Sequence, residues 1–161
     1  MKSRTGRCLL YTSWLSPYFL CLLLDESMRA ARQRRQESAP EPQTDAWIGI
    51  EDVDDAYENL IAERSRFHHW EKRLKDTLPP TELDFCLALL THLSRKAEGL
   101  SLGQLSSRLA KREPDADRRA QRLQDLLVRL TDEGYTSPPD AQRRVHFLSF
   151  PLRDWWNRNH V

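Results

Sequence analysis

The fold is decided by residues 81–150, which read TELDFCLALLTHLSRKAEGLSLGQLSSRLAKREPDADRRAQRLQDLLVRLTDEGYTSPPDAQRRVHFLSF. Apolar side chains recur there with the three-to-four-residue period of a helix over 81–97, 101–112 and 115–133. The run at 143–150 instead alternates apolar and polar residues, as a half-buried strand does. The stretch therefore predicts three helices followed by extended chain.

Local signals mark the ends of these helices. Thr81 with Asp84, and Ser101 with Gln104, have the spacing of a capping box. In such a box a hydroxyl oxygen accepts the third residue's backbone N–H, and that residue's side chain accepts one in return. Gly134 stands where a helix favours a left-handed residue after its end. Because three helices and a hairpin in this order form a winged helix, we predict a mainly α chain that contains a winged-helix domain.

Each predicted helix has an apolar face, which we expect to form the core. The first helix is apolar over much of its circumference, because Phe85 and Leu87 lie off its main face, and it should be central. On the third helix, Arg118, Arg122 and Arg129 lie nearly opposite the apolar residues. The three faces consist of Leu83, Cys86, Leu89, Leu90, Leu93 and Ala97; Leu102, Leu105 and Leu109; and Leu123, Leu126, Leu127 and Leu130.

The chain after the third helix predicts a hairpin. Tyr135 begins its first strand, and 137–140, with two prolines, form its tip. Val145 and Phe147 alternate with polar residues on the returning strand. A short closing helix begins at Asp154.

The N-terminal part consists of an unassigned stretch at 1–13 and a helical segment at 14–78. The apolar run at 8–24 follows basic residues and resembles a signal peptide, but polar residues and a proline interrupt it and no small-x-small cleavage site follows. We therefore expect a cytoplasmic protein with no membrane partner. A helix with a basic end spans 18–36, and 37–45, which contains two prolines, is a loop or linker.

A further helix begins near Ile50 with acidic residues in its first turn. Its apolar stripe is followed at helical spacing by Phe67, Trp70 and Leu74, so we predict one helix up to the prolines at 79–80. The stripe itself consists of Val53, Ala56, Tyr57 and Leu60.

The charge and cysteine totals exclude several classes of protein. The 25 Lys and Arg residues against 24 Asp and Glu give no overall positive field for nucleic acid. The three cysteines are too widely spaced for a disulfide framework or a zinc knuckle. That count is typical of a reducing compartment.

The sequence contains no motif for enzymatic chemistry. Phosphate-binding loops, a GxSxG elbow and an HExxH pair are all missing from it. His68 and His69 point about 100° apart on a helix, which is unfavourable for holding one metal ion. Cys86 and His92 would lie on different sides of their helix, and Cys86 is better explained as a core residue. We expect no enzyme, no metal site and no cofactor site in this chain.

Several segments in one order resemble the C-terminal portion of bacterial and archaeal AAA+ ATP-binding proteins of the predicted-ATPase type. The resemblance covers roughly residues 14–161. The segments that carry it are WLSPYF at 14–19, IEDVDDAY at 50–57, HWEKRL at 69–74 and PLRDWW at 151–156.

The resemblance implies a lid at 14–78 and a winged helix at 79–161, both C-terminal to an ATP-binding domain. Such a domain needs Walker A and Walker B segments, which this chain does not contain. We therefore expect a truncated or frame-shifted form of a longer protein. ATP and Mg²⁺ would be bound only in a full-length relative.

Two functions are compatible with this organisation. In the first, the winged helix binds double-stranded DNA, and the fold favours this hypothesis. In the second, it is a regulatory interaction module that docks on an ATPase core or mediates self-association. Residues 81–161 have 13 basic and 11 acidic side chains, a small surplus for a DNA-binding domain. Trp155 and Trp156 form either the closing core or an exposed anchor. The residues expected to contact DNA are Arg118, Arg119, Arg122, Arg129, Arg143 and Arg144.

Overall fold

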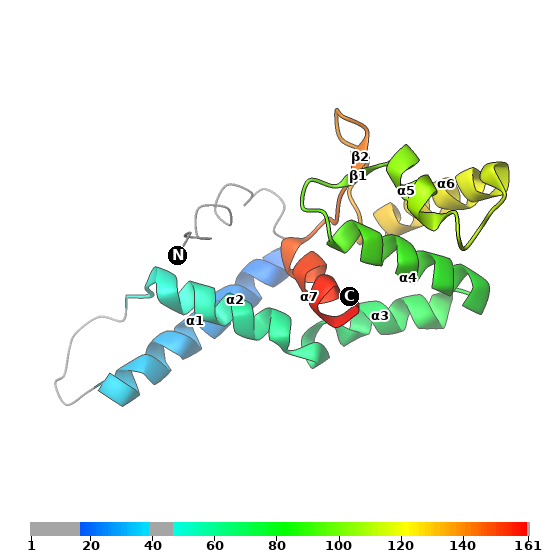
Figure 1. Cartoon of the computed structure of the whole chain (residues 1–161). Coiled ribbons are helices and arrows are strands. Elements are labelled where there is room, and N and C mark those ends of the chain that lie inside the picture. The colour runs from blue at the N-terminus through cyan, green and yellow to red at the C-terminus, as the bar shows by residue number, and fades with distance from the viewer. Residues whose placement is uncertain (1–16, 39–46, 161) are drawn as a thin grey trace. The chain divides into compact units, whose positions relative to one another are not determined.

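The computed structural model describes residues 17–38 and 47–160 and is mainly helical, as predicted (Figure 1). The chain divides into two compact units, Met1–Glu63 and Arg64–Val161. This division differs from the boundary at 78/79 expected from the sequence, because the helix that contains Phe67 packs within the second unit. The unassigned stretch at 1–13 and most of the linker at 37–45 lie outside the described residues.

The first unit contains a pair of helices, α1 (Pro17–Ser38) and α2 (Ile50–Ala62). They pack against each other and cross at an angle (Figure 1). Arg34 of α1 is 2.7 Å from a carboxylate oxygen of Asp52, which is buried in α2. The same oxygen accepts the backbone N–H of Gly49 at 2.7 Å, so one carboxylate both starts α2 and joins it to α1.

The predicted single helix from Ile50 to the prolines is wrong, because it is interrupted at Glu63. The backbone there is extended, with φ −77° and ψ 102°, and α3 (Arg64–Thr77) begins at the next residue. Leu60 and Phe67 are seven residues apart and still match helical spacing. A break of one residue therefore leaves the hydrophobic period intact.

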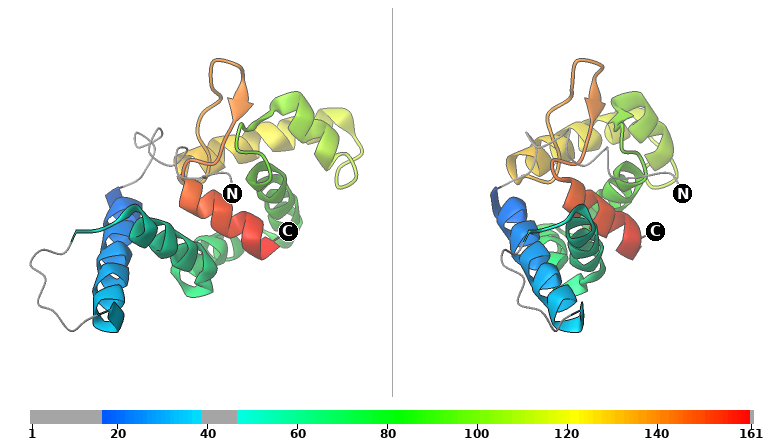
Figure 2. Two further views of the ribbon diagram at one scale, coloured as in Figure 1. Left: turned by 60° about the vertical axis from the view of Figure 1, so that its left-hand side comes forward. Right: turned by 90° about the vertical axis from the view of Figure 1, so that its left-hand side faces the viewer.

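In the second unit α3, α5 and α7 pack against α4 (Pro80–Ser94), α6 packs on α5, and two short strands form a small sheet. The two strands are antiparallel, with Leu100 opposite Val145 and Ser101 opposite Arg144. An isolated bridge joins Thr136 to Phe147. The tip of the resulting hairpin projects away from the helices in both views of Figure 2. The elements are α4 (Pro80–Ser94), β1 (Leu100–Ser101), α5 (Leu102–Leu109), α6 (Ala116–Asp132), β2 (Arg144–Val145) and α7 (Phe150–His160).

The core of this unit follows the predicted apolar faces, with three corrections. Ala97 lies beyond the end of α4 and is exposed, since α4 stops at Ser94. Leu102 is 44% exposed, because it is the first residue of α5 and only Leu105 and Leu109 turn inward. Leu83 is only half-buried, and the remaining core residues of the three helices are Phe85, Cys86, Ala88, Leu89, Leu90, Leu93, Leu123, Leu126, Leu127 and Leu130.

Of the two predicted capping boxes, only that of Ser101 forms. Its hydroxyl accepts the Gln104 N–H at 3.3 Å, and its own N–H is donated to the Gln104 side chain at 3.0 Å. The box at Thr81 is wrong, because α4 already begins at Pro80, whose missing N–H suits the first helical position. Gly134 ends α6 with φ +83°, as predicted.

Tyr135 begins the first arm of the hairpin, as predicted, since its carbonyl accepts the Leu148 N–H at 2.9 Å, and its side chain also belongs to the core. Its ring is fully buried, and its hydroxyl donates to the backbone oxygen of Trp70 at 2.8 Å. The ring of Trp70 contacts it edge-on, with centroids 4.9 Å apart. Tyr135 thereby joins the end of α6 to α3.

The closing helix α7 begins at Phe150, four residues earlier than predicted, and completes the core. Trp155 and Trp156 are 2% and 0% exposed, so they form the closing core rather than an exposed anchor. Trp155 stacks on Phe67 of α3, with centroids 5.5 Å apart, and Trp156 contacts Phe147 at 6.2 Å. These contacts explain why α3 belongs to the second unit.

Replacing Leu90 by Ala should lower the free energy of unfolding by about 2–5 kcal/mol, because it leaves a cavity in the centre of α4's packing. Leu102→Ala is the matched control, and at an exposed position it should change stability by no more than about 0.5 kcal/mol. Both values can be measured by urea denaturation. Equal losses in the two variants would contradict the placement of Leu90 in the core.

Candidate nucleic-acid interface

Arg122, one of the six arginines expected at DNA, is held inside the unit. Its guanidinium is 3.0 Å from Glu82 and 3.2 Å from Glu113, and it donates to the Thr81 carbonyl at 3.1 Å. It also lies over the Phe85 ring, 4.4 Å from its centroid. Four contacts to α4 and to the loop before α6 therefore occupy this side chain.

Two further arginines of α6 also bind within the unit. Arg119 donates to the Ser106 hydroxyl at 2.9 Å and to the Glu113 carbonyl at 2.7 Å, so it joins α5 and the loop to α6. Arg129 pairs with Glu133 at 2.9 Å and donates to the Thr77 carbonyl at 3.3 Å. These side chains fix the position of α6 against its neighbours.

The remaining three arginines are divided between α6 and the hairpin. Arg144 donates to the Glu98 carbonyl at 3.3 Å and so joins β2 to the turn that precedes β1. Arg118 and Arg143 are exposed, and Arg143 adopts φ +56° near the hairpin tip. The six arginines therefore do not form one free basic surface, since four of them bind groups of the protein itself.

The exposed side of α6 has three aspartates and one arginine, Arg118. Its residues fall on one face of the helix, opposite the buried leucines. Among them, Gln121 donates to Asp125 at 2.8 Å, and Val128 is 58% exposed. We call this surface the acidic face; it consists of Asp117, Gln121, Gln124, Asp125, Val128 and Asp132.

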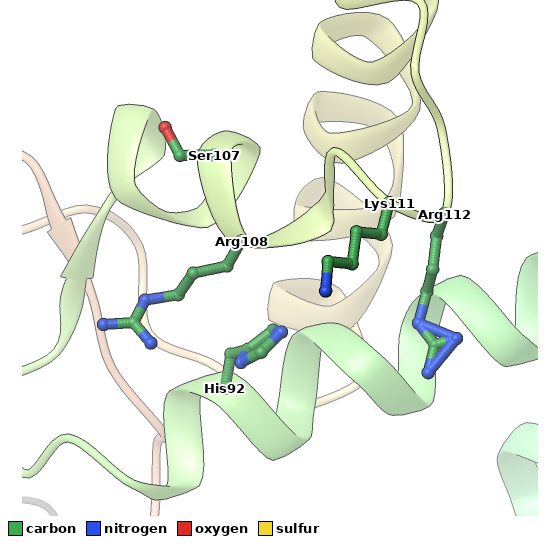
Figure 3. A pocket seen from close by; sticks show the side chains of 5 residues that line it. All are labelled: His92, Ser107, Arg108, Lys111 and Arg112. Carbon is green, nitrogen blue, oxygen red and sulfur yellow. The ribbon is translucent and has the colours of Figure 1, made fainter.

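A second surface of the unit is basic and concave. Between α4 and α5 lies a hollow of about 600 Å³ (Figure 3). We call it the basic hollow; the residues that line it are His92, Ser107, Arg108, Lys111 and Arg112. Burial lowers the pKa of His92, and the positive charges of Arg108, Arg95 and Arg112 lower it further. Sequence reasoning missed this surface, although the cations recur at helical spacing from 108 to 112.

Arg112 differs from the other cations of the basic hollow because it has an acidic partner. Its guanidinium is 2.8 Å from Asp84 of α4. In the part of the chain that the structure describes, neither Arg108 nor Lys111 forms an ion pair. The positive charge of the hollow is therefore concentrated on these two side chains.

The other candidates for chemistry lie apart or are inert. Burial raises the pKa of the Cys86 thiol to about 12, so it is not a nucleophile at neutral pH. His68 and His69 are both exposed. Among the described residues, no three His, Cys, Asp or Glu side chains are grouped so that they could hold a metal ion.

The described helices include none with the length and apolar character needed to cross a membrane.

Comparisons with protein-family models, with curated proteins and with solved structures found no significant match to this chain.

The contacts of Arg122 predict that this residue contributes to stability. Arg122→Ala should lower the free energy of unfolding by about 1–3 kcal/mol, because it leaves the buried carboxylate of Glu113 without its partner. Arg118→Ala removes the same side chain from an exposed position of the same helix, and should change stability by no more than about 0.5 kcal/mol. Thermal and urea unfolding can compare the two variants. A fully stable Arg122→Ala protein would show that the arginine is free for another role.

Proposed function

We propose that Arg64–Val161 is a non-catalytic, winged-helix interaction module that docks on a protein partner through the acidic face of α6. The order of its elements supports the winged helix: α4, β1, α5 and α6 are followed by a hairpin whose returning strand pairs with β1. The preferred partner is the core of an AAA+ ATPase, as the resemblance of residues 14–161 suggests. Self-association is the second possibility within this function.

The observation that carries the proposal is the charge of the acidic face. In helix-turn-helix proteins the second helix of the motif, here α6, enters the major groove. On α6 that exposed surface has three carboxylates, at Asp117, Asp125 and Asp132. Their charge repels DNA phosphates, whereas protein binding to DNA derives much of its affinity from phosphate neutralisation. A basic protein surface is the complementary partner.

The proposal assigns no chemistry to this chain. The first unit, up to Glu63, corresponds in it to a lid, and ATP and Mg²⁺ are bound by the nucleotide domain of a full-length relative. The sequence has no phosphate-binding loop with which to hold them. We place this function in the cytoplasm.

Duplex DNA remains the competing ligand because Arg118 and Arg143 are exposed. The full chain should show no saturable binding to a mixed-sequence duplex at low salt in fluorescence anisotropy. Suppose instead that the chain binds the duplex, and that Arg118→Ala weakens this binding and reduces the slope of log affinity against log salt concentration by about one. DNA would then be the ligand, and the proposal of a protein partner would be contradicted.

The protein partner can be tested by sedimentation velocity. The full chain should form a complex with a purified AAA+ nucleotide-binding core, or with itself. Changing Asp117, Asp125 and Asp132 together to Asn should weaken that complex at least about tenfold, because it removes the charge of the acidic face. In the control, Asp54 and Asp55 of α2, which are also exposed, are changed to Asn. This control should leave the affinity of the complex unchanged. Absence of any complex, or equal effects of the two sets of changes, would contradict the proposal.

A further inference from the structure

The basic hollow is a recess in the protein surface, and four of its five lining residues are exposed. It lies between α4, which contributes His92, and α5 with the turn after it, which contribute the other four lining residues (Figure 3). Its volume of about 600 Å³ falls within the range of roughly 300–1,000 Å³ typical of small-molecule pockets. None of its residues belongs to the acidic face of α6, so the hollow is independent of the function proposed above.

The lining of the hollow has positive charge without acidic residues. Arg108 and Lys111 extend on either side of the His92 ring in Figure 3. Because neither has an ion-pair partner among the described residues, together they contribute two uncompensated positive charges. The nearest acidic partner, Asp84, neutralises Arg112 at the edge of the hollow.

His92 supplies a third polar group with an unused hydrogen-bonding atom. Its Nδ1 is buried and has no hydrogen-bond partner in the described part of the protein. Burial lowers the pKa of His92 most. The positive charges of Arg108 in α5, Arg95 at the end of α4 and Arg112 in the turn after α5 lower this pKa further. An anion in the hollow would offset the three cations and favour protonated His92.

We propose that the basic hollow binds a phosphate group, either as free phosphate or as a small phosphate ester, with Arg108 and Lys111 as its donors and the His92 ring beside them. A phosphate monoester has between one and two negative charges near neutral pH, which matches the two uncompensated cations. Its oxygens point in several directions and can accept from both donors at once. A carboxylate has a single charge and two oxygens in one plane, and fits this arrangement less well.

The cations also have an ordinary structural role to be separated from binding. Positive side chains near the C-terminal ends of α4 and α5 stabilise the helix dipoles. That role accounts for Arg95 and Arg108, which lie at the ends of α4 and α5, but it includes no preference for one anion over another. A purely structural set of cations would not respond specifically to phosphate.

The test is an NMR titration of the full chain with inorganic phosphate, against chloride at matched ionic strength, observed at the His92 ring. We expect a saturable shift with phosphate and none with chloride, because an anion held by Arg108 and Lys111 changes the surroundings of the His92 ring. Glycerol phosphate in a parallel titration distinguishes an ester from free phosphate. Either of the two, bound in this way, supports the proposal.

Variants separate the site from general charge effects. Lys111→Gln and Arg108→Gln should each weaken phosphate binding about tenfold or more, the loss expected for one charge-assisted hydrogen bond. Arg118→Gln makes the same change of charge at an exposed position of α6 and should bind as the unaltered protein does. The comparison of phosphate with chloride in the unaltered protein provides a readout even where a variant fails to fold. A non-saturating shift, equal losses in all three variants, or binding of duplex DNA without phosphate binding would overturn the proposal.

Discussion

Arg122 provides the contact on which the arrangement of the second unit depends. Its guanidinium binds two carboxylates, one carbonyl and the face of Phe85, and these groups come from the start of α4 and the loop before α6. The leucines of α6 determine which side of that helix faces the core. Arg122 adds a directional contact, because a guanidinium has donors in a fixed plane. Arg119 and Arg129 make similar contacts nearer the two ends of α6.

The use of these arginines determines the charge that α6 presents to other molecules. With three of its four cations bound inside the unit, the helix exposes three aspartates and Val128 on its outer side. The unit therefore combines an acidic helix with a basic hollow on a different surface, and residues 64–161 have 18 basic and 13 acidic side chains in total. Separate surfaces of opposite sign suit recognition of separate partners, and they underlie both of our proposals.

The apolar pattern of the sequence predicts the helices of this unit well, whereas the placement of its charged residues needs the folded structure. Leu89, Leu123 and Leu130 are buried as their spacing indicates, because the period of a helix fixes the direction of each side chain. A long arginine at the edge of a face can instead reach back to partners distant in sequence. Arg122 binds the Thr81 carbonyl in this way. The sequence also did not predict the basic hollow, since it exists only where α4 packs against α5. The break at Glu63 could not be predicted either, because the hydrophobic period of the helix continues across it.

The account depends most directly on Arg122 being a structural residue. A double-mutant cycle with Arg122→Met and Glu113→Gln, measured by urea unfolding, isolates the interaction between the two side chains. The salt bridge at 3.2 Å to a buried carboxylate predicts a coupling energy of about 1 kcal/mol or more. Additive effects of the two substitutions, with no coupling, would show that Arg122 is not held within the unit and would contradict the account.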